Sequence, residues 1–164
     1  MLATVAFLVI VAGLALNLAR EVRRQSAETI TRELLAGLEQ ALARYLDVSG
    51  GRLPEAPVLI AGDAEPDSSS LDRRALDNNR AFLRALRASG GMEDPESIFA
   101  RLPRSMYDDL TLRDAWGKPI VLMNRMHPRI GMAVEDKPFF FSAGADRNYL
   151  TREDNVYSYE GPKG

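Results

Sequence analysis

The chain has 164 residues, of which 46% are hydrophobic, and a formal net charge of −2 from 21 basic and 23 acidic side chains. That length suits one domain with an appended segment, and the near-neutral net charge gives no electrostatic argument for nucleic-acid binding, which requires a basic surface. The absence of cysteine excludes disulfides, thiolate catalysis and cysteine-based zinc sites, and the single histidine, His127, excludes a two-histidine metal site. Composition therefore favours a protein that is not an enzyme.

The first predicted element is an apolar segment that carries no charged residue from Leu2 to Ala19. As a helix rising about 1.5 Å per residue, it would extend roughly 27 Å, close to the hydrocarbon thickness of a bilayer. We therefore expect residues 1–19 to form a transmembrane anchor. One alternative is a cleaved secretory signal, since the small residues Ala15 and Ala19 could frame a cleavage site, and another is a buried core helix.

Three arginines follow the apolar segment directly, at Arg20, Arg23 and Arg24. Their position is suited to contact with lipid headgroups. No charged side chain precedes the apolar segment, so the positive-inside rule taken alone would place the rest of the chain in the cytoplasm. A basic leader ahead of the segment would instead hold the N-terminus inside and is expected if the domain is periplasmic.

Residues 20–49 are predicted to continue the same helix in amphipathic form. Apolar side chains recur there at three- and four-residue steps, with charged side chains on the opposite side. The apolar positions are Ala27, Ile30, Leu34, Leu35, Leu38, Ala41, Leu42, Tyr45 and Leu46. Gly50 and Gly51 are predicted to end the helix, and Pro54 follows them. Anchor and amphipathic part thus predict one helix of about 45 residues with a face to bury.

Residues 55–103 are predicted to form a loop and short helices. Prolines, a glycine and the serines at 68–70 indicate a mobile loop over 55–70. A helix is expected from Leu71 to Ser89 with Asp72 as its N-cap, and a short helical turn from Asp94 to Leu102.

Residues 112–164 are predicted to form an antiparallel sheet and a closing loop. The β-type runs are Ile120–Met123, Ile130–Val134, Phe139–Ser142 and Val156–Tyr159. Their close spacing predicts a meander with one face in solvent and the other covered by the long helix. Alternate rings of the three phenylalanines are expected to face that helix, with one ring on the outer surface or at a partner contact. The predicted fold class is α+β, a long N-terminal helix packed on a small C-terminal antiparallel sheet.

Three stretches of the sequence follow one another: Leu34–Tyr45 with Gly50–Pro54, then Leu112–Pro119, which contains Asp-Ala-Trp-Gly-Lys-Pro, then Phe141–Asp146 with Glu153–Tyr157. In this order they resemble the major pseudopilins of type II secretion, which belong to the type IV pilin superfamily. The corresponding stretches of that family are the end of the long helix, the entry into the sheet and the closing loop. Val5 stands where the family's mature chain has a glutamate.

The resemblance implies a pilin-like fold in a single-pass inner-membrane protein, with residues 20–164 as a periplasmic domain. The implied partners are inner-membrane lipid and other pseudopilin-like subunits, in a homo- or hetero-oligomer, and no nucleic acid. The implied function is that of a non-enzymatic structural subunit of a type II secretion or related pilus-type assembly. The alternative is a membrane-tethered periplasmic binding or sensor module.

The resemblance also implies a calcium site with Asp146 and Asp154 as ligands, because the family's closing loop binds calcium through carboxylates and carbonyls. Calcium is the one cofactor suggested. The residues themselves leave open a metal-free loop, in which Arg147 and Arg152 neutralise the acidic side chains.

The remaining candidates for chemistry are expected to be structural. Trp116 is expected to belong to the core, and His127 to be a solvated turn residue. A triad of His127 with Ser105 or Ser142 lacks the nucleophile-elbow and oxyanion patterns that such catalysis requires.

Overall fold

A computed structural model describes residues 2–60, 67–88, 102–108, 110–131 and 137–160; for residues 2–16 and for Ser68 it describes the backbone alone. The elements in chain order are α1 (Leu2–Ser49), α2 (Ser68–Ala88), β1 (Tyr107–Asp108), β2 (Thr111–Leu112), β3 (Val121–Met123), β4 (Phe139–Ser142) and β5 (Val156–Tyr157). The predicted α+β class is confirmed, because the chain combines a long N-terminal helix with small antiparallel sheets.

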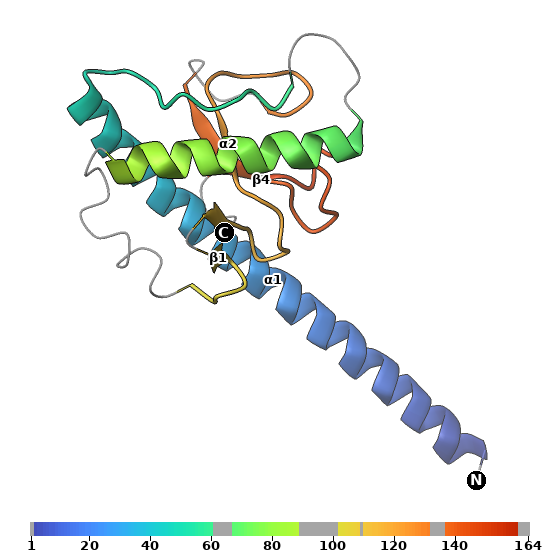
Figure 1. The fold of residues 1–164 in the computed structure, drawn as a ribbon. Helices are drawn as coiled ribbons and strands as arrows, with labels where there is room; N and C mark the ends of the chain where they lie inside the picture. Colours follow the sequence, from blue (N-terminus) through green and yellow to red (C-terminus); the bar gives the residue numbers. More distant parts are fainter. Residues whose placement is uncertain (1, 61–66, 89–101, 109, 132–136, 161–164) are drawn as a thin grey trace.

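Helix α1 runs without a break through Arg20 and ends where the sequence predicts (Figure 1). Gly50 adopts a positive φ of 66°, and the Gly51 N–H donates to the Leu46 carbonyl at 2.8 Å. This is the six-to-one hydrogen bond of a Schellman motif, and it satisfies a carbonyl that the helix end would otherwise leave open. The two glycines therefore fix the point at which the chain turns away.

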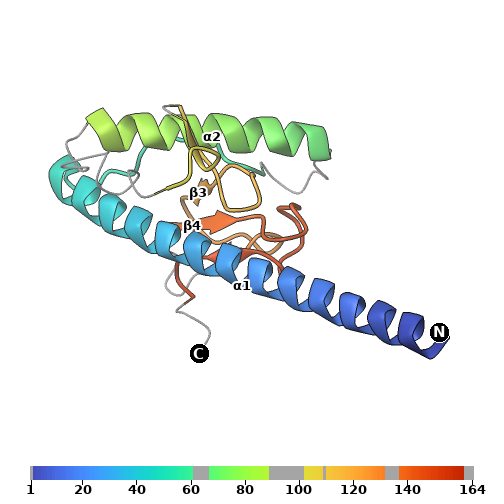
Figure 2. The ribbon, with the colours of Figure 1, turned by 90° about the horizontal axis from the view of Figure 1, so that it is seen from below.

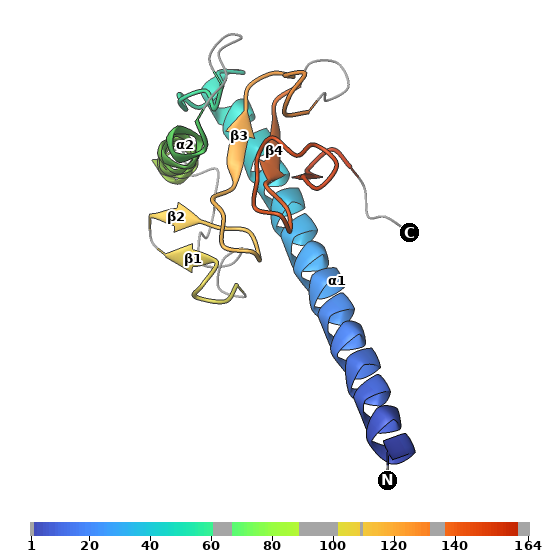
Figure 3. The same ribbon diagram turned by 90° about the vertical axis from the view of Figure 1, so that its right-hand side faces the viewer.

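The two halves of α1 have different surroundings. Its N-terminal half extends away from the rest of the protein, whereas its C-terminal half lies against β4 and β5 (Figures 1 and 3). The buried face of the second half is formed by Thr31, Leu34, Leu35, Leu38, Ala41 and Leu42. Ile30, predicted on this face, is exposed instead, because the neighbouring Thr31 faces the fold and accepts a hydrogen bond from the Ala115 N–H.

A membrane-spanning helix is not found among the residues whose side chains the structure describes. Most of the predicted anchor, residues 1–19, lies outside those residues, because side chains are described from Asn17 onward.

Helix α2 begins at Ser68, so the prediction of a mobile loop at residues 68–70 and of an N-cap at Asp72 is wrong. The preceding residue, Asp67, is the one that caps the helix. Its carbonyl accepts the N–H groups of Ser70 and Leu71 at 3.0 Å each, and its carboxylate accepts the Ser69 hydroxyl. Serine hydroxyls are favoured at a helix start because they satisfy local backbone and side-chain groups there. The predicted turn at residues 94–102 lies almost wholly outside the described residues.

The main sheet has the order β3-β4-β5, with both pairs antiparallel. Val121 pairs with Phe141, which in turn pairs with Tyr157. Strand β4 coincides with its predicted run, and β3 and β5 lie within theirs. The predicted run 130–134 forms no strand in the part that is described: Gly131 makes an isolated bridge to His127, and residues 132–134 lie outside it.

The expectation of one wet sheet face is wrong, because β3 and β4 are buried throughout. Phe140 faces the cluster formed with both helices, and its ring meets that of Phe82 at 5.1 Å. Phe139 and Phe141 face a second cluster with Tyr149 and Tyr157. No ring of the three is on the outer surface. Figure 2 shows β3 and β4 between α1 and α2, so a sheet of short strands has cover on every side.

A second sheet, the hairpin of β1 and β2, was not predicted from the sequence. Each strand has two residues, and the Leu110 N–H donates to the Asp108 carboxylate within the turn. The hairpin lies beside α2 and β3 (Figure 3).

Candidate functional site: the Asp114 turn and the closing loop

The Asp114 turn, residues 114–119, is the motif Asp-Ala-Trp-Gly-Lys-Pro that leads into β3. Asp114 Oδ1 accepts the N–H groups of Trp116 at 3.0 Å and Lys118 at 2.8 Å. The Asp114 N–H donates to the Lys118 carbonyl at 2.8 Å, and Gly117 occupies the left-handed position with φ 90°. An aspartate and a glycine at this spacing thus specify the turn, because one supplies the acceptor and the other the permissive φ.

The second oxygen of Asp114 joins the turn to the sheet. Asp114 Oδ2 accepts the Ser142 hydroxyl at 2.6 Å, and Ser142 Oγ accepts the Gly144 N–H at 3.0 Å. Ser142 is the last residue of β4, and Gly144 belongs to the closing loop, residues 143–155. A short chain of hydrogen bonds therefore connects the entry into the sheet with the loop that closes it.

Asp114 is buried, and none of the ion pairs in the described part of the chain involves its carboxylate. Burial raises the pKa of its carboxyl, and the hydrogen bonds from Ser142, Lys118 and Trp116 oppose that shift. The Lys118 ammonium binds Asp72 of α2 instead, at 2.6 Å and 2.8 Å. Neutral donors alone therefore stabilise the buried carboxylate, which is a less complete compensation than an ion pair would give.

The closing loop is held by backbone groups at its two ends. Gly144 has φ 68°, and a Cβ at this position would collide with the Asp154 carbonyl. The Asp146 N–H donates to Asp154 Oδ2 at 2.6 Å, and the Asn148 N–H donates to Asp146 Oδ1 at 2.8 Å. Both predicted calcium ligands are thus brought into the same loop, with one oxygen of each accepting a backbone N–H.

The carboxylates of Asp146 and Asp154 alone do not complete the ligand set of a calcium ion, and backbone carbonyls would have to supply the remaining oxygens. Calcium takes about six to eight oxygens, and the described residues hold no group of three or more His, Asp or Glu side chains that could bind a metal ion. The ion-paired alternative is not seen either, since the described ion pairs include neither Arg147 nor Arg152. Hydrogen bonds from backbone N–H groups to the Asp146 and Asp154 carboxylates account for the closed shape of the loop. Calcium binding at these two residues stays a prediction.

Aromatic side chains hold the loop on the sheet. The Tyr149 hydroxyl donates to the Pro119 carbonyl at 2.8 Å, and burial raises the pKa of this phenol well above its usual range. Asn155 Nδ2 donates to the Tyr149 carbonyl at 3.0 Å. The Lys118 ammonium lies 5.9 Å from the centre of the Tyr149 ring. These contacts tie the closing loop to the Asp114 turn on a second side.

Two residues that the sequence did not single out, Asn78 and Asn79, connect α2 to the strands. Asn78 donates to the carbonyls of Pro57 and Leu122 and accepts the Leu122 N–H, at 2.8 to 2.9 Å. Asn79 likewise donates to the carbonyls of Leu112 and Ile120 and accepts the Leu112 N–H. Each amide thus imitates a strand partner for an otherwise open edge. The sequence did contain a sign of this role, because Asn78 and Asn79 are polar residues on the side of the helix that is otherwise apolar and buried.

The other candidates have structural surroundings. Trp116 is half-buried and packs against the cluster that includes both helices. His127 is half-buried and opens a tight turn to Gly131, in which its Nδ1 accepts the Arg129 N–H at 3.3 Å. Ser142 binds Asp114 rather than His127, so no triad forms from these residues.

Comparisons of this chain with protein-family models, with curated proteins and with solved structures find no significant match. A function must therefore be inferred from the sequence and the geometry together.

Proposed function

We propose that this chain is a non-enzymatic, pseudopilin-like structural subunit, anchored in the inner membrane, with its C-terminal domain in the periplasm. The observation that carries the proposal is α1. It is one continuous helix whose C-terminal half packs on a small sheet, while its N-terminal half extends free of the fold (Figure 1). Such a helix can be held by lipid and later by the helices of neighbouring subunits.

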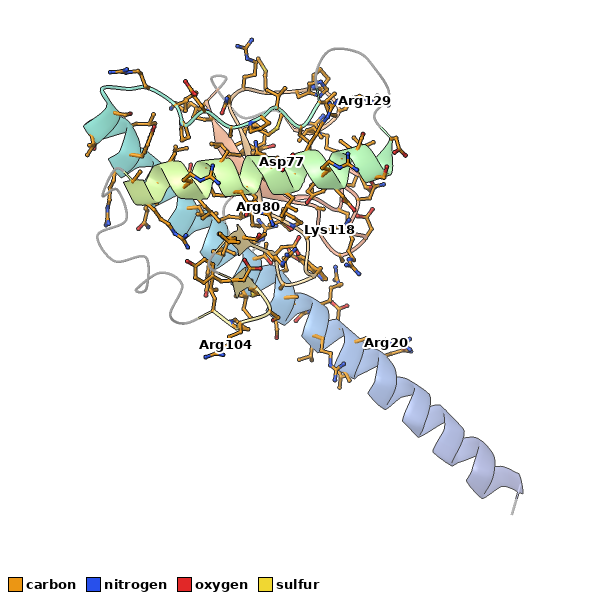
Figure 4. The ribbon with its side chains drawn as sticks, viewed as in Figure 1. Arg20, Asp77, Arg80, Arg104, Lys118 and Arg129 are labelled. Atoms are coloured by element: carbon orange, nitrogen blue, oxygen red, sulfur yellow. The ribbon has the colours of Figure 1, made fainter. Side chains whose placement is uncertain are left out.

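The sequence of the free half supports both environments. Residues 2–19 carry no charge, and lipid tails and apolar side chains satisfy an apolar helix about equally well. At the C-terminal end of this segment, Leu18 is 67% exposed, and Val22, one turn further along the helix, is 54% exposed. Arg20 points away from the helix in Figure 4, where it suits a lipid headgroup. The free half therefore has an apolar segment, residues 2–19, followed directly by the basic residues Arg20, Arg23 and Arg24.

A single-cysteine cross-linking experiment tests the proposal, because the natural chain has no cysteine. Leu18→Cys is introduced into the full chain in cells that assemble the system, and membranes are treated with a mild oxidant. Bundled helices would yield disulfide-linked dimers. The matched control is Val58→Cys, since Val58 is also exposed but lies on the folded part, and far fewer dimers are expected from it.

The alternative function, a tethered binding or sensor module, predicts a different cross-linking result. A tethered periplasmic binding or sensor module would enter the membrane fraction, yet Leu18→Cys would give no more dimer than Val58→Cys. A chain absent from the membrane fraction would contradict both functions.

A further inference from the structure

The C-terminal half of α2 borders a concave basic surface that the proposed function does not use. Arg80, Arg84 and Arg87 line a groove of about 500 Å³, with Leu83 and Ala88 from the same helix and Leu110 from the β1–β2 turn. Leu110 is 63% exposed there. Figure 4 shows Arg80 on α2, close to the start of this stretch.

The described charged side chains that line this first groove are all basic. From Asn78 to Ala88 the helix carries three arginines and no acidic residue, and no carboxylate lines the groove among the described residues. Arg80 and Arg84 are one turn apart, a spacing at which like charges destabilise a helix by a few tenths of a kcal/mol. The helix dipole favours a cation only in the last turn, so it accounts for Arg87 and not for Arg80.

Arg87 already has a structural role. Its guanidinium lies over the Tyr107 ring, 5.7 Å from the centroid, and donates to the Tyr107 hydroxyl. Arg80 and Arg84 are exposed, and no ion pair involves them within the part of the chain that is described. These two side chains are therefore available to a partner.

A second groove of about 610 Å³ continues the surface around Arg84 and Ala88 to the end of α1. Its described lining includes two basic residues, Arg52 and Arg84, and one acidic residue, Glu55. It also includes Val48, which is 68% exposed. The ends of the two helices thus present guanidinium groups interleaved with exposed apolar side chains.

We propose that this surface, called the basic groove, docks an acidic protein segment that carries an apolar side chain. Guanidinium groups bind carboxylates in a bidentate fashion, and the floor of Leu83, Ala88 and Leu110 suits an aliphatic side chain.

The basic groove lies beyond reach of the membrane that would hold the apolar segment. Tyr45, which lines the second groove, is about 39 Å along α1 from Ala19. A protein segment therefore fits this position better than a lipid surface. This inference goes beyond the proposed function. The choice of a protein segment over a lipid surface rests on the proposed anchor, whereas the charge and the lining of the basic groove do not.

The test uses the full chain in a neutral detergent and a short fluorescent peptide with several glutamates around one leucine. Fluorescence anisotropy should show saturable binding that weakens with salt. The double variant Arg80→Gln with Arg84→Gln should weaken it about tenfold or more, as loss of two carboxylate contacts predicts. The control Arg73→Gln, on the exposed face of the same helix but outside the groove, should change binding less than about twofold.

Four results would overturn the proposal. They are an absence of saturable binding, an equal loss in Arg73→Gln, and equally tight binding of a peptide with glutamine in place of glutamate. The fourth is binding that appears only after Glu93, Asp94 and Glu96 are replaced by glutamine, which would assign the groove to the chain's own acidic segment. Anionic vesicles bound through Arg80 and Arg84, in the absence of peptide binding, would assign it to lipid.

Discussion

At the residue scale, Asp114 shows how a buried carboxylate is tolerated when no cation lies beside it. Its two oxygens accept three hydrogen bonds, from Trp116, Lys118 and Ser142. Hydrogen bonds to a charged group stabilise by about 1.5 to 3 kcal/mol each, whereas desolvation of the anion costs several. The raised pKa of Asp114 indicates that desolvation is the larger effect. The carboxylate therefore specifies the turn at some cost in stability.

The pH dependence of this cost is predicted to be measurable with Asp114→Asn. Because the folded-state pKa of Asp114 is raised, the folded chain binds the proton more tightly than the unfolded chain. The contribution of Asp114 to stability is thus greatest below its ordinary pKa of 3.8 and is lost as the pH rises through the folded-state pKa, by about 1.4 kcal/mol per unit of difference.

Urea unfolding of the natural chain and of Asp114→Asn over a pH series provides the measurement. The stability of the natural chain relative to the variant should fall as the pH rises from strongly acidic, and then level off. A difference that stays constant, or one that grows with pH, would contradict a raised pKa at this residue.

Alanine substitutions at Gly144 and Gly117 separate two effects on unfolding free energy. One is the steric clash of an added Cβ, and the other is the strain of placing a side chain on a left-handed backbone. Both have positive φ, but a Cβ on Gly117 meets nothing within 4 Å, whereas one on Gly144 meets the Asp154 backbone. Gly117→Ala should cost about 1 kcal/mol of unfolding free energy. Gly144→Ala should cost about 2 kcal/mol more, because the loop must move. If thermal or urea unfolding shows that both variants lose the same stability, the closing loop moves away from the added Cβ at no cost.

At the element scale, α2 completes the edges of two strands through side-chain amides. Asn78→Ala would remove two donated hydrogen bonds and one accepted hydrogen bond, and would leave the Leu122 N–H and carbonyl without them. We expect a loss of about 3 kcal/mol in unfolding free energy and faster amide exchange at Leu122. The control is Asp77→Ala on the exposed side of α2 (Figure 4), which should change stability by less than about 0.5 kcal/mol.

The closing loop is predicted to keep its shape without calcium. The carboxylates of Asp146 and Asp154 already accept backbone N–H groups, so added calcium should leave the melting temperature of the full chain unchanged. Asp154→Ala should lower stability by about 1 to 2 kcal/mol in calcium-free buffer, because the Asp146 N–H loses its acceptor. A calcium-dependent rise in melting temperature that Asp146→Asn abolishes would instead establish the metal site.

The elements best predicted from sequence were those with a strong local pattern. Double glycine fixed the end of α1, and the run Phe139–Ser142 coincided with β4. The start of α2 was missed because a serine run suits both a loop and a first helical turn. The hairpin β1–β2 was missed because two-residue strands carry no periodicity. The second buried face of the sheet was missed because its cover comes from loops and tyrosines distant in sequence.

The site was predicted less well than the fold, for a physical reason. The Asp114 turn stood out as a motif, because its own residues satisfy most of its hydrogen bonds. The bond from Ser142 to Asp114 and the bonds of the Asn78 and Asn79 amides join residues at least 21 positions apart. Tertiary packing determines such pairs, and a single sequence carries no direct record of them.

At the scale of the whole molecule, α1 belongs to two environments and joins them without a break. Its second half buries Leu35 and Leu38 completely in the fold. Its first half is apolar in sequence from Leu2 to Ala19 and extends beyond the folded part (Figure 3). If the proposed function holds, one covalent helix carries two separable properties, membrane retention and folding of the C-terminal domain.

Two substitutions in this helix should separate those properties. Val9→Asp places a charge at the centre of the apolar segment, at a cost of about 3 kcal/mol for insertion, and should move the chain out of the membrane fraction while the C-terminal domain stays resistant to protease. Leu35→Asp buries an unpaired charge among Leu34, Leu38 and their neighbours, which costs several kcal/mol, and should leave the chain in the membrane with a protease-sensitive domain. Val9→Leu is the control and should change neither readout. Retention of Val9→Asp in the membrane fraction would contradict the anchor, and a protease-resistant Leu35→Asp would contradict the packing of α1 on the sheet.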